Sequence, residues 1–443
     1  MNEDELRDLA QAAVKAGADG AEVAYAERQA LSVTVRKGDL EEVEREESRE
    51  LGLRVLVGRR HASVSGSDLS ADGRRKLLER VVAMARLAAE DPYAGLPSRE
   101  RLASGPHADL DLFDPAEPTA ESLEDRALAT EGAAIAVPGV SNSDGASASW
   151  SRGVWRLATS DGFFGAHRGS HSSISAAVIA GEGAEMELGY DGRSTRWLSD
   201  LPDPSSIGVE AGERAVAALA PRKLASTTAP VIFENRQAAS LLSPLISAIA
   251  GPAVARGVSF LKDKLGQRLF SESITLTDDP HRPRGLGSSP FDDEGVANQR
   301  RALIDKGVLT TWLLNSSSAR QLGLETTGHA SRGLAGPPGV SASNLSLSAG
   351  DQDLSGLMAE AGQGLVVTSM FGPSLNANTG DWSVGCSGYW FEAGERAYPV
   401  NEITVAGNLI DIYARLVPGS DLFSRGSWEI PSILVDGLAI AGK

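Results

Sequence analysis

Residues 230–261, PVIFENRQAASLLSPLISAIAGPAVARGVSFL, decide how the rest of the chain is interpreted. The run PVIF at 230–233 is typical of a buried strand, and the polar residues at 234–236 supply turn and helix N-cap chemistry. We therefore predict a helix over 237–250, with apolar side chains at 241, 242, 245, 246 and 249 packed on most of its sides. Serine and proline interrupt this apolar run well before the roughly 20 residues that cross a bilayer, so it is interpreted as a buried core helix.

This stretch and several later ones resemble the TldE (PmbA) branch of the TldD/TldE metalloprotease family. The later segments are ARGVSFLKDKLGQRLFS (255–271), DDPHRPRGLGSSPFDDEG (278–295), NTGDWS (378–383), YPVNEITVAGNL (398–409) and DGLAIAGK (436–443). In the zinc-bearing branch, the corresponding helix carries a His-Glu-x-x-x-His motif. Aligning strand on strand places Ser243, Pro244 and Ala248 at those three positions. The resemblance therefore implies a chain without catalytic or metal-ligating residues of its own.

The three replacements have a direct chemical meaning. Two imidazoles can hold one zinc ion and a carboxylate can act as general base, whereas a hydroxyl, a pyrrolidine ring and a methyl group can do neither. Pro244 is also predicted either to kink the helix or to move its start close to Leu242. The zinc-bearing branch takes a further ligand from a late cysteine. Counting back from the C-terminal end places that position at 421–426, where no cysteine occurs.

Composition limits the possible partners and the compartment. The 443 residues predict two or three domains, and 59 acidic against 42 basic residues give a net charge of -17. This charge disfavours direct binding of nucleic acid or of an anionic membrane. A single cysteine, Cys386, excludes an intrachain disulfide and suits a reducing compartment. The N-terminal residues lack the features of a signal peptide, so we expect a cytoplasmic protein.

The predicted fold class is α+β. Residues 1–220 are predicted to form an N-terminal α/β domain, an antiparallel sheet covered by helices, and 221–443 a β-rich domain around the buried central helix. Within the first domain, strands over 21–35, 51–57 and 61–65 form a meander, and strands over 147–158, 162–180 and 182–198 form a second antiparallel portion. Helices are predicted over 3–15, 70–90, 119–135 and 205–219. Residues 91–118 contain five prolines and are predicted to be a long loop, either ordered or flexible.

Several groups of polar residues are candidates for metal or substrate sites. The glutamates at 41, 42, 44, 46, 47 and 50 are interpreted as a solvated strand face. His167 and His171 have a spacing that suits a metal on a helix, but the surrounding pattern is that of a strand, which would hold the rings roughly 13 Å apart. Asp292, Asp293 and Glu294 could hold a hard cation, although turn chemistry is the better interpretation.

A glycine- and aromatic-rich stretch near 376–390 is the other candidate site. Its backbone could approach another chain closely, and tryptophan and tyrosine are favoured at interfaces; the alternative is a glycine-rich turn region near the core. The residues predicted to contact substrate or partner are Asn378, Thr379, Gly380, Asp381, Trp382, Gly388 and Tyr389. Cys386 could be a nucleophile, but no histidine partner is evident from the sequence.

The resemblance implies a specific role. TldE-type chains assemble with a TldD-type zinc subunit around a chamber in which unfolded peptide is cleaved, and family roles include peptide maturation and antitoxin degradation. It implies zinc in the partner, no cofactor in this chain, and a homodimer as a possibility for the chain alone. One alternative is a self-associating peptide-binding or regulatory protein without a protease, for example a modulator of DNA gyrase. Another is a cryptic hydrolase that uses Cys386 or the carboxylates at 292–294.

Overall fold

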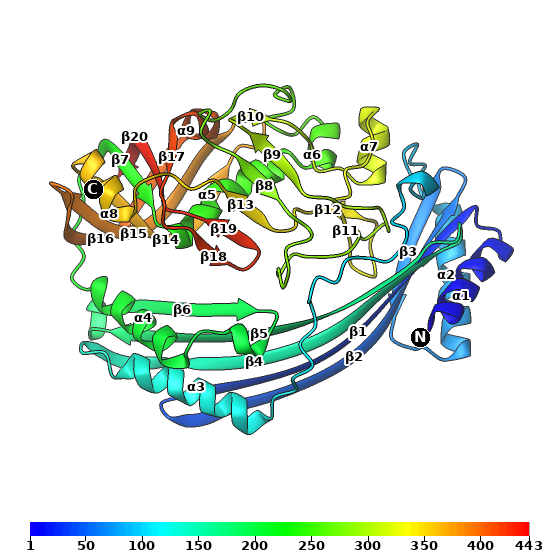
Figure 1. Ribbon diagram of the computed structural model, residues 1–443, viewed down its shortest axis with the longest axis horizontal. Coiled ribbons are helices and arrows are strands. Elements are labelled where there is room, and N and C mark those ends of the chain that lie inside the picture. The colour runs from blue at the N-terminus through cyan, green and yellow to red at the C-terminus, as the bar shows by residue number, and fades with distance from the viewer. Residues whose placement is uncertain (443) are drawn as a thin grey trace.

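One curved antiparallel sheet organises the N-terminal half of the protein (Figure 1). The computed structural model describes residues 1–442, apart from the side chain at position 184. The strand order is β3-β2-β1-β4-β5-β6. The strands are β1 (Gly20–Arg36), β2 (Asp39–Val57), β3 (Arg60–Gly66), β4 (Val140–Thr159), β5 (Phe164–Ala180) and β6 (Glu187–Thr195).

The two antiparallel portions predicted from the sequence form a single sheet. β1 pairs with β4 from Glu22 opposite Thr159 to Val35 opposite Ala146, which joins the meander to the later strands. The predicted antiparallel sheet is therefore confirmed, and its two portions are joined by a strand pairing that the sequence did not predict. Alternation along a strand reports which residues share a face, but it says nothing about a neighbour that lies far away in the sequence.

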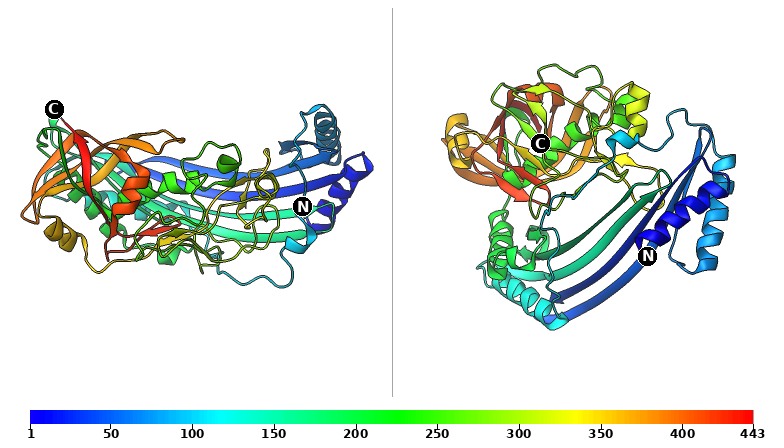
Figure 2. Two further views of the ribbon diagram at one scale, coloured as in Figure 1. Left: turned by 90° about the horizontal axis from the view of Figure 1, so that it is seen from above. Right: turned by 45° about the vertical axis from the view of Figure 1, so that its right-hand side comes forward.

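Four helices cover the outer face of this sheet (Figure 2). They are α1 (Glu3–Lys15), α2 (Ala71–Leu87), α3 (Ala120–Ile135) and α4 (Pro204–Ala217). Each begins at a polar N-cap whose side chain accepts a backbone N–H, and these caps are Asn2, Ser70, Thr119 and Asp203. α1 and α2 pack with Val23 and Tyr25, and α3 and α4 pack with Val33 and Val35. Since these β1 residues differ by even numbers, all four helices lie on one face, and the even-numbered residues face the C-terminal half.

The C-terminal half is built on a closed barrel. Its strands follow the order β16-β15-β14-β7-β20-β17, and a further pairing of β16 with β20 closes the cylinder. These strands are β7 (Thr227–Phe233), β14 (Gly364–Leu375), β15 (Asp381–Glu392), β16 (Glu395–Asn408), β17 (Leu416–Pro418) and β20 (Ile433–Ala441). The α+β fold class with a β-rich second half is thus confirmed.

Short elements surround the barrel (Figure 1). A second six-stranded sheet contains β8 (Leu276–Asp278), β9 (Arg301–Asp305), β10 (Val308–Leu309), β13 (Leu345–Leu347), β18 (Phe423–Arg425) and β19 (Trp428–Ile430), and β11 (Ala330–Ser331) pairs with β12 (Gly339–Val340). The helices of this half are α5 (Asn235–Ala248), α6 (Gly251–Ala255), α7 (Ser316–Leu322), α8 (Leu354–Ala361) and α9 (Leu409–Arg415). Earlier in the chain, before β7, lie three single-turn 3-10 helices: η1 (Arg99–Arg101), η2 (Gly183–Glu185) and η3 (Leu198–Asp200).

The central helix that was predicted over 237–250 is α5. It begins at Asn235 and continues through Pro244, so the predicted start near Leu242 is wrong. The proline lacks the N–H that would bond the carbonyl of Ser240, and Ser240 lies on the exposed face, where water can take that place. The leucines at 241, 242 and 245 are fully buried in the C-terminal core. The serines at 240, 243 and 247 are exposed, so the helix is buried on one face only.

Residues 91–118 run between the two halves with η1 as their regular element. The N–H of Ala103 donates to the carbonyl of Gly295 at 2.8 Å, and the carbonyl of Leu112 accepts from the N–H of Ser170 at 2.9 Å. The carbonyl of Leu110 accepts from the N–H of Arg284 at 2.8 Å. The segment is therefore an ordered strap with hydrogen bonds to both halves. Across residues 1–442, no helix is long and apolar enough to span a membrane.

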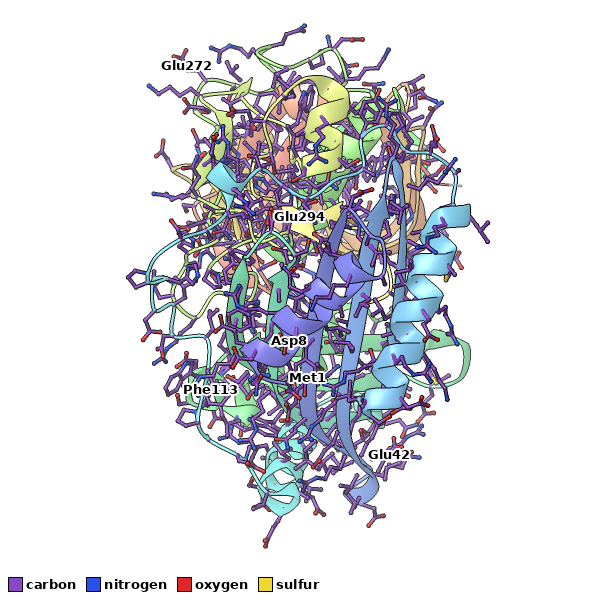
Figure 3. All side chains as sticks on the ribbon, turned by 90° about the vertical axis from the view of Figure 1, so that its right-hand side faces the viewer. Met1, Asp8, Glu42, Phe113, Glu272 and Glu294 are labelled. Atoms are coloured by element: carbon purple, nitrogen blue, oxygen red, sulfur yellow. The ribbon has the colours of Figure 1, made fainter. Side chains whose placement is uncertain are left out.

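A buried ionic cluster also joins the halves. One oxygen of Glu22 on β1, Oε2, lies 2.7 Å from Nη1 of Arg54 on β2 and 2.9 Å from Nη1 of Arg332 from the C-terminal half. All three side chains are at most 3% exposed. Burial acts to raise the pKa of Glu22, but the two guanidinium groups outweigh it and hold the pKa below its ordinary value. In Figure 3, Glu294 lies near this end of the long strands.

The opposite end of β1 and β2 carries the run of glutamates. Glu42 marks this end in Figure 3. All six glutamates from position 41 to position 50 are exposed, which confirms the interpretation as a solvated strand face. Like charges along this strand also discourage pairing with another copy of the chain.

Candidate functional site

The three positions aligned with a zinc motif do not fit a metal. Ser243 is exposed, and its hydroxyl donates to the carbonyl of Ala239 at 3.0 Å within α5. Ala248 is 5% exposed in the core, and its carbonyl accepts from the Ser259 hydroxyl at 2.7 Å. With Pro244 between them, this helix offers no imidazole, thiolate or carboxylate at these positions. Within residues 1–442, no group of three or more His, Cys, Asp or Glu side chains is placed to hold a metal ion.

The late segment 421–426 lies beside the start of this helix. The resemblance places the cysteine ligand of the zinc-bearing branch in this segment. α5 packs against β18 and β19, and the Asn235 amide donates to the carbonyl of Asp421 at 3.1 Å. The Asp421 carboxylate accepts from the hydroxyl and the N–H of Ser432 at 2.7 and 2.9 Å. The helix and the late segment that carry zinc ligands in the zinc-bearing branch therefore lie side by side here as well. The polar side chains of Asn235, Asp421 and Ser432 form hydrogen bonds within the chain.

Two arginines connect the start of α5 to the N-terminal sheet. Arg214 of α4 pairs with both oxygens of Glu234 at 2.7 and 3.0 Å, a bidentate geometry. Nη1 of Arg236 lies 2.7 Å from the buried carboxylate of Asp191 on β6, and Nη2 donates to the carbonyl of Tyr190 at 2.9 Å. Burial, with Arg214 close by, lowers the pKa of Arg236 to about 10, so it stays charged at neutral pH.

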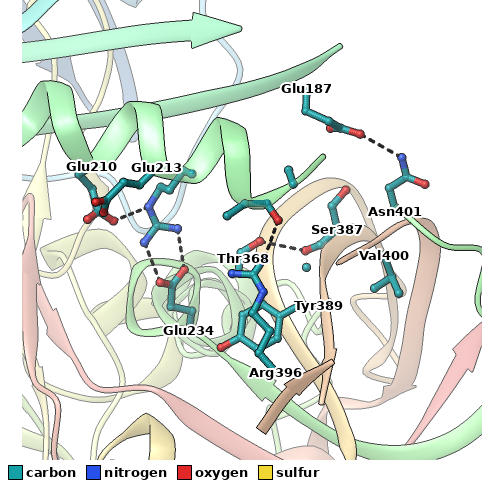
Figure 4. Close-up of a pocket in the computed structure, with 14 residues that line it drawn as sticks. Glu187, Glu210, Glu213, Glu234, Thr368, Ser387, Tyr389, Arg396, Val400 and Asn401 are labelled. Carbon is teal, nitrogen blue, oxygen red and sulfur yellow. Dashed lines mark hydrogen bonds and ion pairs between the residues drawn. The ribbon is translucent and has the colours of Figure 1, made fainter. Parts of the chain in front are cut away.

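A cavity of about 260 Å³ lies beside these pairs, and we call it the junction pocket (Figure 4). It is lined by residues of α4, β6, β14, β15 and β16, namely Glu187, Glu210, Glu213, Arg214, Ala217, Ala218, Glu234, Thr368, Ser387, Gly388, Tyr389, Arg396, Val400 and Asn401. Asn401 donates to Glu187 at 3.3 Å, and burial raises the pKa of Glu187. Arg396 lies over the ring of Tyr389, 4.6 Å from its centroid. Burial, and then the charge of Glu234, raises the pKa of Tyr389 to about 12.

The residues predicted to contact substrate or partner fall into two groups. Asn378 and Thr379 are exposed in the turn before β15, where Gly380 has a φ of 82°. In the same group, Asp381 is exposed and accepts from Thr379 at 2.7 Å, whereas Trp382 is 4% exposed in the core. The other group, Gly388 and Tyr389, lines the junction pocket. Six residues of strand separate the groups by roughly 20 Å, so they do not form one site.

The turn interpretation of residues 292–294 agrees with their contacts. Asp292 accepts from the N–H groups of Glu294, Val296 and Ala330 at 2.8 to 3.0 Å. Asp293 accepts from the N–H of Arg332 at 2.9 Å. Glu294 accepts from the N–H and hydroxyl of Ser316 at 2.8 and 2.6 Å. These carboxylates hold loops in place, and each already has a partner.

The two histidines that raised the question of a metal lie on β5, as the strand pattern predicted. Burial, and next the charge of Arg196, lowers the pKa of His167 to about 4. The same two causes, followed by Arg28, lower the pKa of His171. The ring of His167 packs edge-on against Phe291, with centroids 5.8 Å apart.

Cys386 is expected to be unreactive in the folded protein. It is fully buried on β15, and burial raises the pKa of its thiol to about 12. Since the thiolate is the nucleophile, an aromatic disulfide reagent at pH 8 should not label the native chain. The same reagent in urea should label one thiol per chain. Absorbance measures the extent of labelling. Rapid labelling without urea would contradict the burial of Cys386 and support the hypothesis that it is a nucleophile.

The charged residues that define the junction were not predicted from the sequence. Glu187, Glu210, Arg214 and Arg236 belong to three elements, and each alone looks like an ordinary surface charge. The only local signal was the Glu-Asn-Arg run at 234–236, which was interpreted as cap chemistry. Glu234 is the N-cap residue, but its side chain bonds Arg214 and not the helix.

Comparisons with known proteins agree with this framework. Residues 21–85, 113–219 and 226–442 match PmbA/TldA metallopeptidase domain 1, central domain and C-terminal domain, respectively. This chain belongs to the PmbA/TldA metallopeptidase family. The resemblance noted from the sequence is thereby confirmed.

Individual relatives cover almost the whole chain. The metalloprotease PmbA of Escherichia coli O157:H7 is 39% identical over 427 residues, which cover 96% of this chain and 93% of the relative. A PmbA homologue of Haemophilus influenzae is 35% identical, covering 100% and 97%.

Solved structures of the family show the same fold. A protein from Bacteroides thetaiotaomicron, described as a candidate modulator of DNA gyrase, has a TM-score of 0.91 at 30% identity over the full length of both chains. TldE from Thermococcus kodakarensis has a TM-score of 0.87 at 21% identity, covering 98% of this chain and 99% of that one. The latter likeness concerns the fold alone.

Proposed function

We propose that this chain is the subunit without a zinc site in a two-subunit metallopeptidase, and that it pairs with a related zinc-bearing, TldD-like chain. The observation that carries the proposal is the set Ser243, Pro244 and Ala248 on α5, together with the absence of a cysteine from residues 421–426 beside the start of that helix. The family of the chain and the names of its relatives support a peptidase context. The residues at the three positions support a role outside the chemistry itself.

The chain's own contribution in this proposal is to form part of the chamber wall and to hold extended peptide. β6 supports this role, because it is an edge strand of the N-terminal six-stranded sheet and pairs with β5 as its one neighbouring strand in residues 1–442. The carbonyl of Tyr190 already accepts from Arg236, so a peptide would use the remaining backbone groups of this edge. An extended peptide can add to such an edge through backbone hydrogen bonds, which tolerate many side chains. The barrel is closed through the pairing of β16 with β20, and β17, the edge strand beside it, has 3 residues. Unfolded peptides are the substrate class, with peptide maturation and antitoxin degradation as roles.

The proposal includes a cytoplasmic location, supported by a single buried cysteine that suits a reducing compartment. A second candidate function is regulation without a protease, as a self-associating protein that acts on DNA gyrase. It is favoured by the description of the Bacteroides protein, which matches this chain over its full length.

Native mass spectrometry of the chain, alone and co-expressed with a zinc-bearing family member, distinguishes the two candidates. Pairing should give a heterodimer with one zinc ion, whereas the isolated chain should retain none and cleave no peptide. Stoichiometric zinc and peptide cleavage by the isolated chain would refute the proposed role. A stable homodimer that ignores the zinc-bearing chain would favour the regulatory candidate.

A further inference from the structure

A second cavity lies where the tip of the β18–β19 hairpin meets the edge of the N-terminal sheet. We call it the arginine pocket; its volume is about 170 Å³. It is lined by Ser173, Ile174, Ser175, Tyr190, Gly192, Arg193, Ser194, Ser424, Arg425 and Gly426. The lining combines two guanidinium groups with four serine hydroxyls and one tyrosine hydroxyl, and it contains no carboxylate. This composition is that of a site for an oxyanion.

The charges around the arginine pocket do not cancel. Arg193 lies 2.6 Å from Asp191, but Arg236 shares the same carboxylate oxygen at 2.7 Å. Arg425 forms no ion pair with a carboxylate anywhere in residues 1–442. Two arginines therefore share one fully buried aspartate, and Arg236 also lies 3.5 Å from Glu210. Arg425 adds a third positive charge close to Arg236. The pocket is a positive spot in a chain whose net charge is -17.

Aromatic rings hold both guanidinium groups in place. Arg193 lies over Phe423, 4.5 Å from the ring centroid, and Arg425 lies over Tyr190 at 5.8 Å. Each arginine of one element thus stacks on a ring of the other, so the hairpin and β6 are cross-linked. A stacked guanidinium can still offer its edge N–H groups to a planar, bidentate acceptor. Nη1 of Arg193 donates to Asp191 and to the carbonyl of Gly192, which leaves its Nη2 and Nε for a ligand. A carboxylate has that geometry.

Rows of hydroxyls on the inner face of the sheet lead to the arginine pocket. In the strand register, Ser32, Ser149, Ser173 and Ser194 stand directly opposite one another across β1, β4, β5 and β6. A second row contains Thr34, Ser147 and Ser175 and ends at Gly192. Since the helices cover the side of Val33 and Val35, these rows lie on the opposite, uncovered face. All seven hydroxyl residues are partly exposed.

The rows suit a peptide backbone. The serine pairs 149–173 and 147–175 bond to each other at 2.8 and 3.1 Å, and each hydroxyl keeps further capacity to donate or accept. Four strands about 4.8 Å apart span roughly 14 Å, which is about four residues of extended peptide. Uncharged hydroxyls can form hydrogen bonds with a peptide backbone, and such bonds do not select particular side chains. Because these hydroxyls are partly exposed on a face without helices, they are accessible to a ligand.

We propose that the arginine pocket binds the C-terminal carboxylate of an extended peptide that lies on these hydroxyl rows. The inference rests on the proposed function, from which it takes the peptide as ligand. Arg425 and Arg193 would bind the two carboxylate oxygens, and Ser194 would donate a further hydrogen bond. The Ser424 hydroxyl, which donates to Glu429 at 3.4 Å, would turn toward the ligand to do the same. The chain would thereby fix one end of a peptide and let the sequence of the remainder vary.

Fluorescence anisotropy with two peptides tests this assignment. Both are the same short peptide of alanine and serine, labelled at the amino end, one with a free C-terminus and one amidated. The full chain should bind the free acid about tenfold more tightly than the amide, because charge-assisted hydrogen bonds are lost on amidation. In Arg425→Ala this preference should fall to about one, and Arg425→Lys should retain part of it.

Arg222→Ala is the matched control, because Arg222 also lies over a tyrosine, Tyr398, at 4.6 Å, and lies outside the pocket. It should keep the full preference for the free acid. The assignment is overturned if the full chain binds neither peptide at millimolar concentration, binds both equally, or keeps its preference in Arg425→Ala. Competition by inorganic phosphate at far lower concentration than acetate would identify a phosphate site and overturn the peptide assignment. Zinc content and pairing are measured separately, so these outcomes leave the test of the proposed function intact.

Discussion

Glu22→Gln is expected to lower the free energy of unfolding by about 3–5 kcal/mol, because it leaves two buried guanidinium groups without a counter-charge. The amide keeps the size of the side chain, so the effect reports charge and not packing. Urea denaturation followed by circular dichroism measures it as a fall in the midpoint. Glu44→Gln, at an exposed position on β2, is the control and should change little. A midpoint for Glu22→Gln equal to that control would show that Arg54 and Arg332 do not depend on this carboxylate.

The same cluster predicts how stability responds to acid. The pKa of Glu22 in the folded chain lies below its ordinary value of 4.5. A carboxyl of this kind contributes its full stabilisation above the unfolded pKa and loses it as the pH falls through the folded one. The wild-type chain should therefore lose stability below about pH 4.5 more steeply than Glu22→Gln, which has no such proton to take up. Parallel curves for the two proteins would contradict this linkage.

Asp292→Ala is expected to cost roughly 3 kcal/mol or more, since three buried N–H groups lose their acceptor at about 1–3 kcal/mol each. These groups belong to Glu294, Val296 and Ala330, so the loss affects the turn and β11 together. The measurement is again the urea midpoint. Asp292→Asn is the matched control, because its one remaining oxygen can still accept from two of the three donors.

The pKa of Asp292 sharpens this comparison. Burial, and then the charge of Glu294, raises the pKa of Asp292 well above its ordinary value. A neutral amide avoids the cost of this buried charge, so Asp292→Asn should lie much closer to the wild type than Asp292→Ala. If both variants were stable but peptide cleavage by an assembled complex were lost, the carboxylate would have a chemical role. Lost stability in the alanine variant alone assigns it to the turn.

Sequence patterns were sufficient where the determining interactions are local. The strand at 227–233, the helix after it and the capped helices α1 to α4 follow from periodicity and cap residues within a few positions. The loop carboxylates at 292–294 were correctly assigned to turns for the same reason. The positions aligned with a zinc motif were found because the resemblance supplied the register of the helix.

Features made by distant strands could not be predicted in this way. The pairing of β1 with β4 merges two predicted portions into one sheet, and no local pattern encodes it. The ion pair of Arg236 with Asp191 and the meeting of Arg193 with Phe423 likewise depend on how the hairpin and β6 come together. The hydroxyl rows exist only in the register of four strands, since each strand alone shows isolated serines. The two groups around 378–382 and 388–389 were treated as one candidate site because a strand's length was not taken into account.

The order of strands in the barrel has a consequence for how the protein folds. β7 lies between β14 and β20, and both are made long after it. Its two edges therefore stay unpaired while most of the C-terminal half is synthesised, and closure needs β20 to insert between β7 and β16. Such non-local pairing makes folding slow and leaves apolar strands open to aggregation. The barrel strands against which α5 packs are thus expected to leave the newly made chain prone to aggregation until β20 is paired.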